Sequence, residues 1–219
     1  MVDTSPAFLD KASQGLLGLG YAGLSTAPNA PFTLLDAWVQ NGMTDQIGFR
    51  ACPYTRENQS YIDFGNTEVY SACGVTEPVA TTRSPEKSYM TLDVKSISVN
   101  GVKTVLPMDF QSLNAKSERT WSILDSCTSQ IKIPAGPLDT LQNTIIASNG
   151  MPAALTDDQV QEFLMGTRTI AEGVNDQFIW THLPAVSFEL ATNSTPGTFN
   201  LILGPRQYIQ RGPDGFCNK

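Results

Sequence analysis

The chain has 219 residues, of which 41% are hydrophobic, and this composition supports a packed core and excludes intrinsic disorder. Its formal net charge is −7, and its 14 lysines and arginines are scattered along the sequence. Because binding to phosphates needs clustered cations, we expect no nucleic-acid partner. The sequence contains no run of 18 apolar residues, so we predict no membrane span in this chain.

Short runs rich in β-branched and aromatic residues dominate the chain, and they are separated by Gly, Pro, Asn and Ser. Such runs predict strands, here at residues 60–64, 89–99, 130–133, 185–190 and 199–203. The second run is followed by Asn100-Gly101, a dipeptide typical of tight hairpin turns. The chain is therefore predicted to be mostly β.

Helical spacing of apolar residues is found in only three places, at residues 32–40, 137–148 and 156–164. The last begins with a capping box, in which Thr156 is the N-cap and Gln159 follows three residues later. Pro, Thr and Ser cluster within residues 75–88 and predict a boundary between 1–77 and 78–219. We expect a mostly β fold with few short helices.

Four cysteines, Cys52, Cys73, Cys127 and Cys217, occur with a single histidine and form no CxxC pair. We therefore expect no metal site and no cofactor. Two disulfides in an oxidising compartment fit these cysteines, and three pairings are open. Asn58 and Asn193 begin candidate glycosylation sequons, which also favour a secreted or endolysosomal protein.

The segment that carries chemistry is Ser122-Ile-Leu-Asp125, in which a carboxylate ends a hydrophobic run. Ser126, Cys127, Thr128 and Ser129 follow, and hydroxyl groups can tune a carboxylate by hydrogen bonding. The same residues also fit an ordinary strand end closed by a hydroxyl-capped turn. One carboxylate is not enough for acid–base hydrolysis without metal, because two must share a proton.

This segment resembles the second active-site motif of pepsin-like aspartic proteases, hydrophobic-hydrophobic-Asp-Thr/Ser-Gly-Thr-Ser/Thr. Other family segments resemble QGLLGLGY, YIDFG, YMTLDVKSISVNG, LPAVSF and FNLILGPRQYIQRGPDGFC, at residues 14–21, 61–65, 89–101, 183–188 and 199–217. They stand in the family's order, and the last is most similar to memapsins. The resemblance implies a partial bilobal acid-protease fold. Residues 1–77 would be the end of the N-terminal lobe with the inter-lobe strands, and 78–219 the C-terminal lobe.

The resemblance also implies roles for the residues of the motif. Asp125 would be the catalytic aspartate of the second lobe, and Ser126 would tie together the two active-site loops. Thr128 would form a hydrogen bond with the outer carboxylate oxygen of Asp125, and Ser129 would support the same loop. The motif is broken at Cys127, which stands where the family has glycine and adds a side chain close to the carboxylate.

The first catalytic motif of the family has no good match, because Asp3-Thr4-Ser5 is followed by Pro6 and preceded by no hydrophobic strand. The implied function is an aspartic endopeptidase that acts on polypeptides. This chain would supply the second aspartate and be inactive alone, and the missing N-terminal-lobe segment would come from the same precursor or another chain. A catalytically dead binding or inhibitor module, favoured by Cys127, is the alternative. A single lobe paired with itself is a third reading.

Overall fold

The computed structural model describes residues 18–24, 32–43, 46–50, 52, 59–65, 69–72, 75–78, 81–86, 89–113, 119–125, 131–170, 177–193, 197–212 and 215–218. Its helical segments are η1 (Ala22–Leu24), α1 (Leu34–Gln40), α2 (Ala135–Ala147), α3 (Asp157–Leu164) and α4 (Pro205–Tyr208). Its strands are β1 (Ile47–Arg50), β2 (Tyr61–Phe64), β3 (Val69–Ala72), β4 (Val75–Pro78), β5 (Thr91–Leu92), β6 (Val94–Val99), β7 (Val102–Lys103), β8 (Ser122–Ile123), β9 (Val186–Ala191), β10 (Thr198–Leu203), β11 (Ile209–Gly212) and β12 (Gly215–Asn218).

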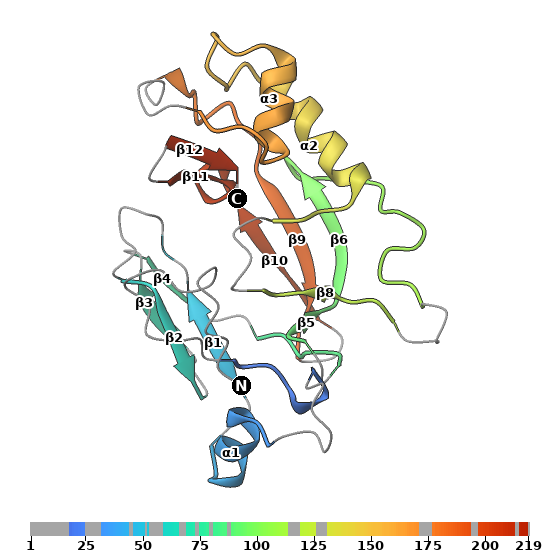
Figure 1. The fold of residues 1–219 in the computed structure, drawn as a ribbon, viewed down its shortest axis with the longest axis vertical. Helices are drawn as coiled ribbons and strands as arrows, with labels where there is room; N and C mark the ends of the chain where they lie inside the picture. The colour runs from blue at the N-terminus through green and yellow to red at the C-terminus, as the bar shows by residue number, and fades with distance from the viewer. Residues whose placement is uncertain are drawn as a thin grey trace.

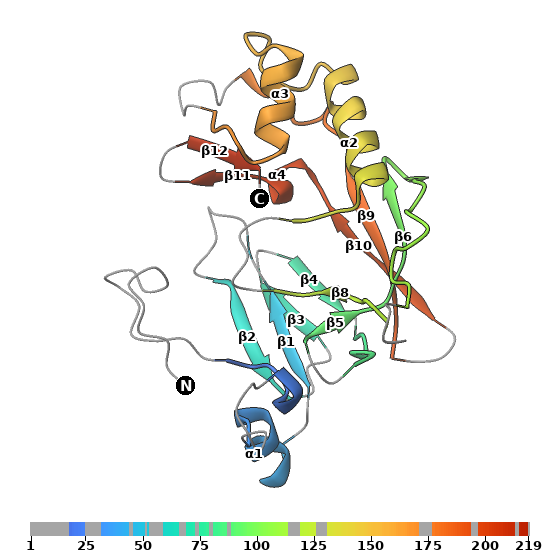
Figure 2. The same ribbon diagram turned by 45° about the vertical axis from the view of Figure 1, so that its right-hand side comes forward.

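The largest sheet has the strand order β10-β9-β6-β7, and its strands are antiparallel. The other strands pair two by two, as β1-β2, β3-β4, β5-β8 and β11-β12. Figures 1 and 2 show β1 to β4 and α1 toward one end of the molecule and α2 and α3 toward the other. The prediction of a mostly β fold with few short helices is confirmed.

The predicted strands at 60–64, 185–190 and 199–203 correspond to β2, β9 and β10 within one residue at each end. The run at 89–99 is divided into β5, which pairs with β8, and β6, which pairs with β9. Within β6, the register with β9 shifts between Val94 and Ser96. Such a bulge places one extra residue in the strand and bends it. The three predicted helices correspond to α1, α2 and α3, and the boundary predicted within 75–88 stays a prediction.

The capping box predicted at the start of α3 is present. The backbone N–H of Gln159 donates to the Thr156 hydroxyl at 3.3 Å, and the backbone N–H of Thr156 donates to the Gln159 side chain at 3.1 Å. A second capping box, between Thr33 and Asp36, begins α1. These bonds satisfy backbone donors that a helix leaves unpaired in its first turn.

One core joins the large sheet to the helices α2 and α3. Its buried side chains include Ile97 from β6, Ile145 from α2, Phe163 from α3 and Leu190 from β9. Figure 1 shows α2 beside the upper part of β6, and α3 lies against α2 and β12. The core therefore lies within residues 94–209 and includes the strands β6 and β9 of the large sheet.

The β6-β7 hairpin turns at Asn100 and Gly101, whose φ angles are 49° and 77°. Two positive φ angles in a two-residue loop are typical of a type I′ turn, which matches the twist of the flanking strands. The side-chain oxygen of Asn100 also accepts a hydrogen bond from the backbone N–H of Ala185 at 3.1 Å. The backbone N–H of Asn100 donates to the Ala185 carbonyl at 2.9 Å. The turn is thus tied to the chain that enters β9.

We expect Asn100→Ala to lower the free energy of unfolding by about 1–2 kcal/mol, because alanine resists positive φ and removes the acceptor for Ala185. Asn100→Asp keeps the tolerance of positive φ and the acceptor for Ala185, so its free energy of unfolding should fall by less. Urea denaturation of the two variants beside the wild type gives the comparison. Equal stability of the alanine variant and the wild type would show that the turn does not contribute as described.

Candidate active site

Asp125 lies two residues after the end of β8 and is exposed. The strand before it is paired with β5, with Thr91 opposite Ile123 and Leu92 opposite Ser122. The backbone N–H of Leu124 continues this register by donating to the Met90 carbonyl at 2.8 Å. The hydrophobic strand predicted before Asp125 is therefore present, and its backbone bonds fix the chain up to the residue before the carboxylate.

The strand β5 that supports β8 is itself held by a partly buried pair of hydroxyl groups. The hydroxyls of Ser84 and Thr91 lie 2.8 Å apart, and the backbone N–H of Thr91 donates to Ser84 at 3.1 Å. The backbone N–H of Glu86 donates to the Thr91 hydroxyl at 3.3 Å. Residues 84–86 are thereby fastened to the strand that positions Asp125, and Ser84 and Thr91 act on the site through β5 and β8.

The residues predicted to complete the motif, Ser126, Cys127, Thr128 and Ser129, lie outside the described residues. The candidate sequon residue Asn58 also lies outside them. Asn193 is exposed between β9 and β10, and its backbone N–H donates to the Thr81 carbonyl at 3.1 Å. The described part of the site is thus the strand that leads to Asp125 and the chain that follows the loop.

The chain resumes at residues 131–134, where the predicted strand at 130–133 is wrong over its described residues. Ile131 to Ile133 pair with no described strand, and Pro134 is the N-cap of α2. Proline has no backbone N–H, so Pro134 cannot donate a hydrogen bond to a neighbouring strand. Of the two isoleucines in this run, Ile133 packs its side chain against the core, whereas Ile131 is 44% exposed.

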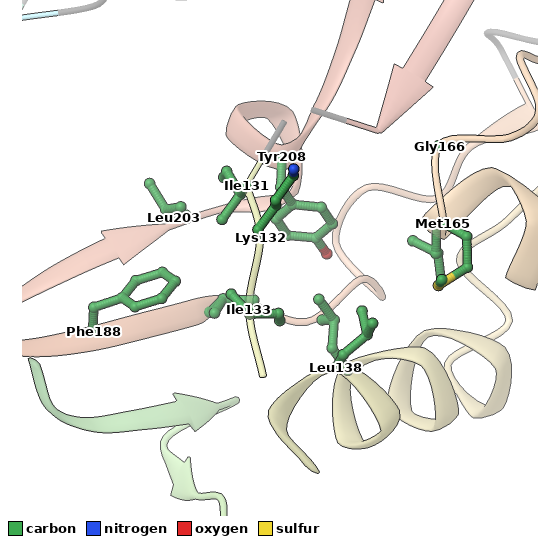
Figure 3. Close-up of a pocket in the computed structure, with 12 residues that line it drawn as sticks. Ile131, Lys132, Ile133, Leu138, Met165, Gly166, Phe188, Leu203 and Tyr208 are labelled. Atoms are coloured by element: carbon green, nitrogen blue, oxygen red, sulfur yellow. The ribbon is translucent and has the colours of Figure 1, made fainter. Parts of the chain in front are cut away.

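An apolar pocket of about 240 Å³ adjoins this segment. Figure 3 shows Ile133, Leu138 and Phe188 on one side of it and Tyr208 and Leu203 on the other. The Tyr208 hydroxyl donates to the Pro184 carbonyl at 2.7 Å, and burial raises the pKa of that phenol. The pocket has the size and lining to hold apolar groups and offers one lysine, Lys132, as its cation.

A second pocket, of about 300 Å³, lies beside the strand that leads to Asp125 and includes Asp109, Trp121 and Ser122 in its wall. Side chains alternate along an extended chain, so Ser122 and Asp125 point to opposite faces. This pocket is therefore not directly beside the carboxylate.

The family model described as eukaryotic aspartyl protease matches residues 2–188 of the chain. This span covers most of the sequence and includes Asp125, the strand before it and the loop after it. The chain belongs to the eukaryotic aspartyl protease family. No curated protein matches it at a level that identifies a relative.

As an aspartyl protease segment, the chain falls among aspartic-type peptidases, whose substrates are polypeptides. The family is typically extracellular or lysosomal. Four of the resembling segments around Asp125, at 14–21, 61–65, 89–101 and 183–188, fall within the matched span, whereas 199–217 lies beyond its end. Among the helices of the described residues, none is long and apolar enough to cross a membrane.

Metal-ligating side chains do not gather in threes anywhere in the part of this aspartyl protease that the structure describes. The backbone N–H of Cys52 donates to the Ser60 hydroxyl at 2.9 Å. The pairing of the four cysteines stays a prediction.

Sequence reasoning missed the residues that brace the aspartyl protease strand β8. Ser84 and Thr91 carry no motif, and only the Ser84-Pro85 dipeptide signals a turn near them. Gln111 was also missed, although its buried side chain holds Val94 at both backbone groups. Such contacts join residues far apart in sequence, so local patterns do not indicate them.

Proposed function

We propose that this chain supplies Asp125 as one aspartate of the catalytic pair of an aspartic endopeptidase and is inactive alone. The observation that carries the proposal is the exposed carboxylate of Asp125 at the end of a strand anchored by the 2.8 Å bond between Leu124 and Met90. A catalytic carboxylate must be accessible to substrate and held by a rigid element, and this arrangement supports both needs. The membership of the family supports the same reading.

The proposed mechanism uses a water molecule between Asp125 and a second aspartate from an N-terminal-lobe segment. One carboxylate takes a proton from the water as its oxygen attacks the peptide carbonyl carbon, and the protonated partner donates a hydrogen bond to the carbonyl oxygen. Collapse of the tetrahedral intermediate breaks the C–N bond and passes a proton to the leaving amine. Ser126, Thr128 and Ser129 would orient the Asp125 loop.

A catalytically dead binding or inhibitor module is the second candidate, and Cys127 favours it. A glycine at that place lets the backbone approach the carboxylate, whereas a cysteine adds a Cβ and a sulfur. The crowding would shift Asp125 away from its partner. Such a module would keep the fold and bind a protein partner without cleaving it.

The proposed protein is secreted or endolysosomal, with its cysteines paired as Cys52–Cys73 and Cys127–Cys217. Four cysteines without a CxxC pair support an oxidising compartment, and the exposed position of Asn193 suits a glycosylated loop. We also propose that residues 1–77 belong to the N-terminal lobe and the inter-lobe strands, and 78–219 to the C-terminal lobe.

The test compares the 219-residue chain with a longer single-chain protein, called the continuous protein below. It is expressed from a gene that also includes the coding sequence upstream of this chain. We expect no peptide hydrolysis by the chain alone at about pH 4 and pepstatin-sensitive hydrolysis by the continuous protein, because only the latter holds two aspartates. In the continuous protein, Asp125→Asn should abolish hydrolysis and pepstatin binding. Asp139→Asn, at an exposed position on α2, is the matched control and should retain both.

Three outcomes would contradict the proposal. An upstream sequence without a hydrophobic-Asp-Thr/Ser-Gly motif removes the second aspartate. A folded continuous protein that neither cleaves peptides nor binds pepstatin supports the dead module. Hydrolysis by the 219-residue chain alone, lost in Asp125→Asn, supports a lobe paired with itself.

A further inference from the structure

The strand β10 ends the large sheet, with β9 on one side and no strand of the described residues on the other. Figure 2 shows it running the length of the sheet beside β9. Its six residues, Thr198 to Leu203, make it as long as β6 and β9. A strand at the edge of a sheet presents unpaired backbone N–H and C=O groups that another strand can bond.

The hydrogen bond from the Thr192 N–H to the Gly197 carbonyl, at 2.9 Å, sets which groups of β10 face outward. In an antiparallel ladder, opposite residues alternate between pairs that exchange hydrogen bonds and pairs that do not. Thr192 and Gly197 form a hydrogen-bonded pair, so every second residue of β10 after Gly197 also forms backbone hydrogen bonds with β9. These residues are Phe199, Leu201 and Leu203. The N–H and C=O groups of Thr198, Asn200 and Ile202 therefore point to the open edge.

The side chains of β10 carry none of the features that usually protect an edge. The strand TFNLIL contains no charge and no proline, and Leu201 and Ile202 are 43% and 63% exposed on its two faces. Natural edges are commonly short, charged or interrupted by proline. The opposite edge of the same sheet, β7, is protected in this way because it has only two residues and one is Lys103.

Glu189 of β9, which is opposite Asn200 of β10, has its negative charge compensated by Lys103 of the same chain. Glu189 of β9 accepts hydrogen bonds from Ser96 at 2.6 Å, Lys103 at 3.0 Å and Thr198 at 3.2 Å. The Ser96 and Lys103 bonds hold the pKa of this carboxyl below its usual range. Across a twofold pairing of β10, two such carboxylates would stand about 14 Å apart, at three strand spacings.

We propose that β10 is a homodimer interface, in which it pairs antiparallel with β10 of a second copy about a twofold axis through Asn200. Asn200 then faces its own copy, and Thr198 faces Ile202 of the partner. This register satisfies the outward groups of all three residues with about six backbone hydrogen bonds. It also packs Ile202 against Thr198 on one face and Leu201 against Phe199 on the other.

A second copy fits this edge because the strand is complementary to itself. Opposite residues in an antiparallel pair must point to the same face, and a twofold axis through a residue meets that condition. An uncharged strand also brings no like charges together. The proposal does not depend on Asp125, which lies after β8 and outside β10.

Sedimentation velocity of the 219-residue chain over about 5–500 µM tests the proposal, with an expected dissociation constant on the order of 100 µM, since the paired strands bury less area than a standard interface. Ile202→Lys places a charge on the edge and should weaken association about tenfold or more. Asn200→Pro removes one outward N–H without touching the β9 ladder and should do the same. Val102→Lys, on β7 and 68% exposed, is the matched control and should dimerise like the wild type.

Amide hydrogen exchange measured by NMR supplies an independent readout. The amides of Asn200 and Ile202 should exchange more slowly at high protein concentration than at low, whereas that of Val102 should not change. A chain that stays monomeric over the whole range overturns the proposal, as does a dimer that persists unchanged in folded Ile202→Lys and Asn200→Pro. Monomers that bind an extended peptide at β10 would assign the edge to a different partner and also overturn it.

Discussion

Replacing Phe163 with alanine is expected to lower the free energy of unfolding by about 3–5 kcal/mol, since a buried aromatic side chain is removed and a cavity is left. Phe163 is 0% exposed and belongs to the core cluster that also includes Ile145 of α2 and buried side chains of β6 and β9. It belongs to α3, which has only eight residues and depends on packing for its position. Losing this side chain loosens the packing of α3 against α2 and β12, the elements that it contacts.

Chemical denaturation followed by circular dichroism measures this effect, and a control on the same helix end isolates it. Met165, the C-cap of α3, is 57% exposed. We expect Met165→Ala to change the free energy of unfolding by no more than about 0.5 kcal/mol. If Phe163→Ala costs less than about 1 kcal/mol, the packing of α3 in the core is not as described.

The second large effect is expected at Gln111, whose side-chain amide bonds both backbone groups of one residue. Its oxygen accepts from the Val94 N–H at 3.1 Å, and its NH₂ donates to the Val94 carbonyl at 2.8 Å. Both residues are buried, and Gln111 has a φ of 51°. The side chain thus replaces a strand partner at the bulge where β6 begins.

Gln111→Glu keeps the shape and the acceptor but removes the donor, so that a carboxylate faces the Val94 carbonyl. We expect a loss of about 2–4 kcal/mol at pH 7, because a buried acceptor is left unpaired beside a negative charge. Proximity to the carbonyl and burial raise the pKa of the introduced carboxyl in the folded state. Its protonated form can donate, so the loss should shrink as the pH falls below that pKa.

Denaturation curves at pH 7 and about pH 4 give both results, and Gln161→Glu, exposed on α3, serves as the same chemical change at a solvated place. The control should be close to neutral at both pH values. A loss in Gln111→Glu that stays the same at the two pH values would show that the donor to Val94 is not the cause.

The parts of the fold that local chemistry dictates were predictable. Asn100-Gly101 tolerates positive φ, and Thr156 with Gln159 satisfies the first donors of a helix, so both were recognised from adjacent residues. The strand before Asp125 was predictable for the same reason. Its position in space was not, because it depends on the pairing of β8 with β5 across thirty-odd residues of sequence.

The errors and omissions share one physical cause, which is contact between residues distant along the chain. The run at 130–133 has strand composition, yet its described part pairs with no described strand, and Ile133 packs against the core instead. The strand β7 has only two residues and leaves too little pattern to detect. The side-chain loop of Gln111 and the pair of Ser84 and Thr91 have no local signature at all.

The pairing of β6 with β9 has a consequence during synthesis. Val99 of β6 is opposite Val186 of β9, so the partner of β6 is translated 87 residues later. At ribosomal speeds of about 5–20 residues per second, β6 waits roughly 4–20 s for this neighbour. During that interval the nascent chain displays an apolar strand with one side unoccupied, and closure of so long a loop makes completion of the sheet a late event. The sheet that holds the core is therefore where chaperone assistance should matter most.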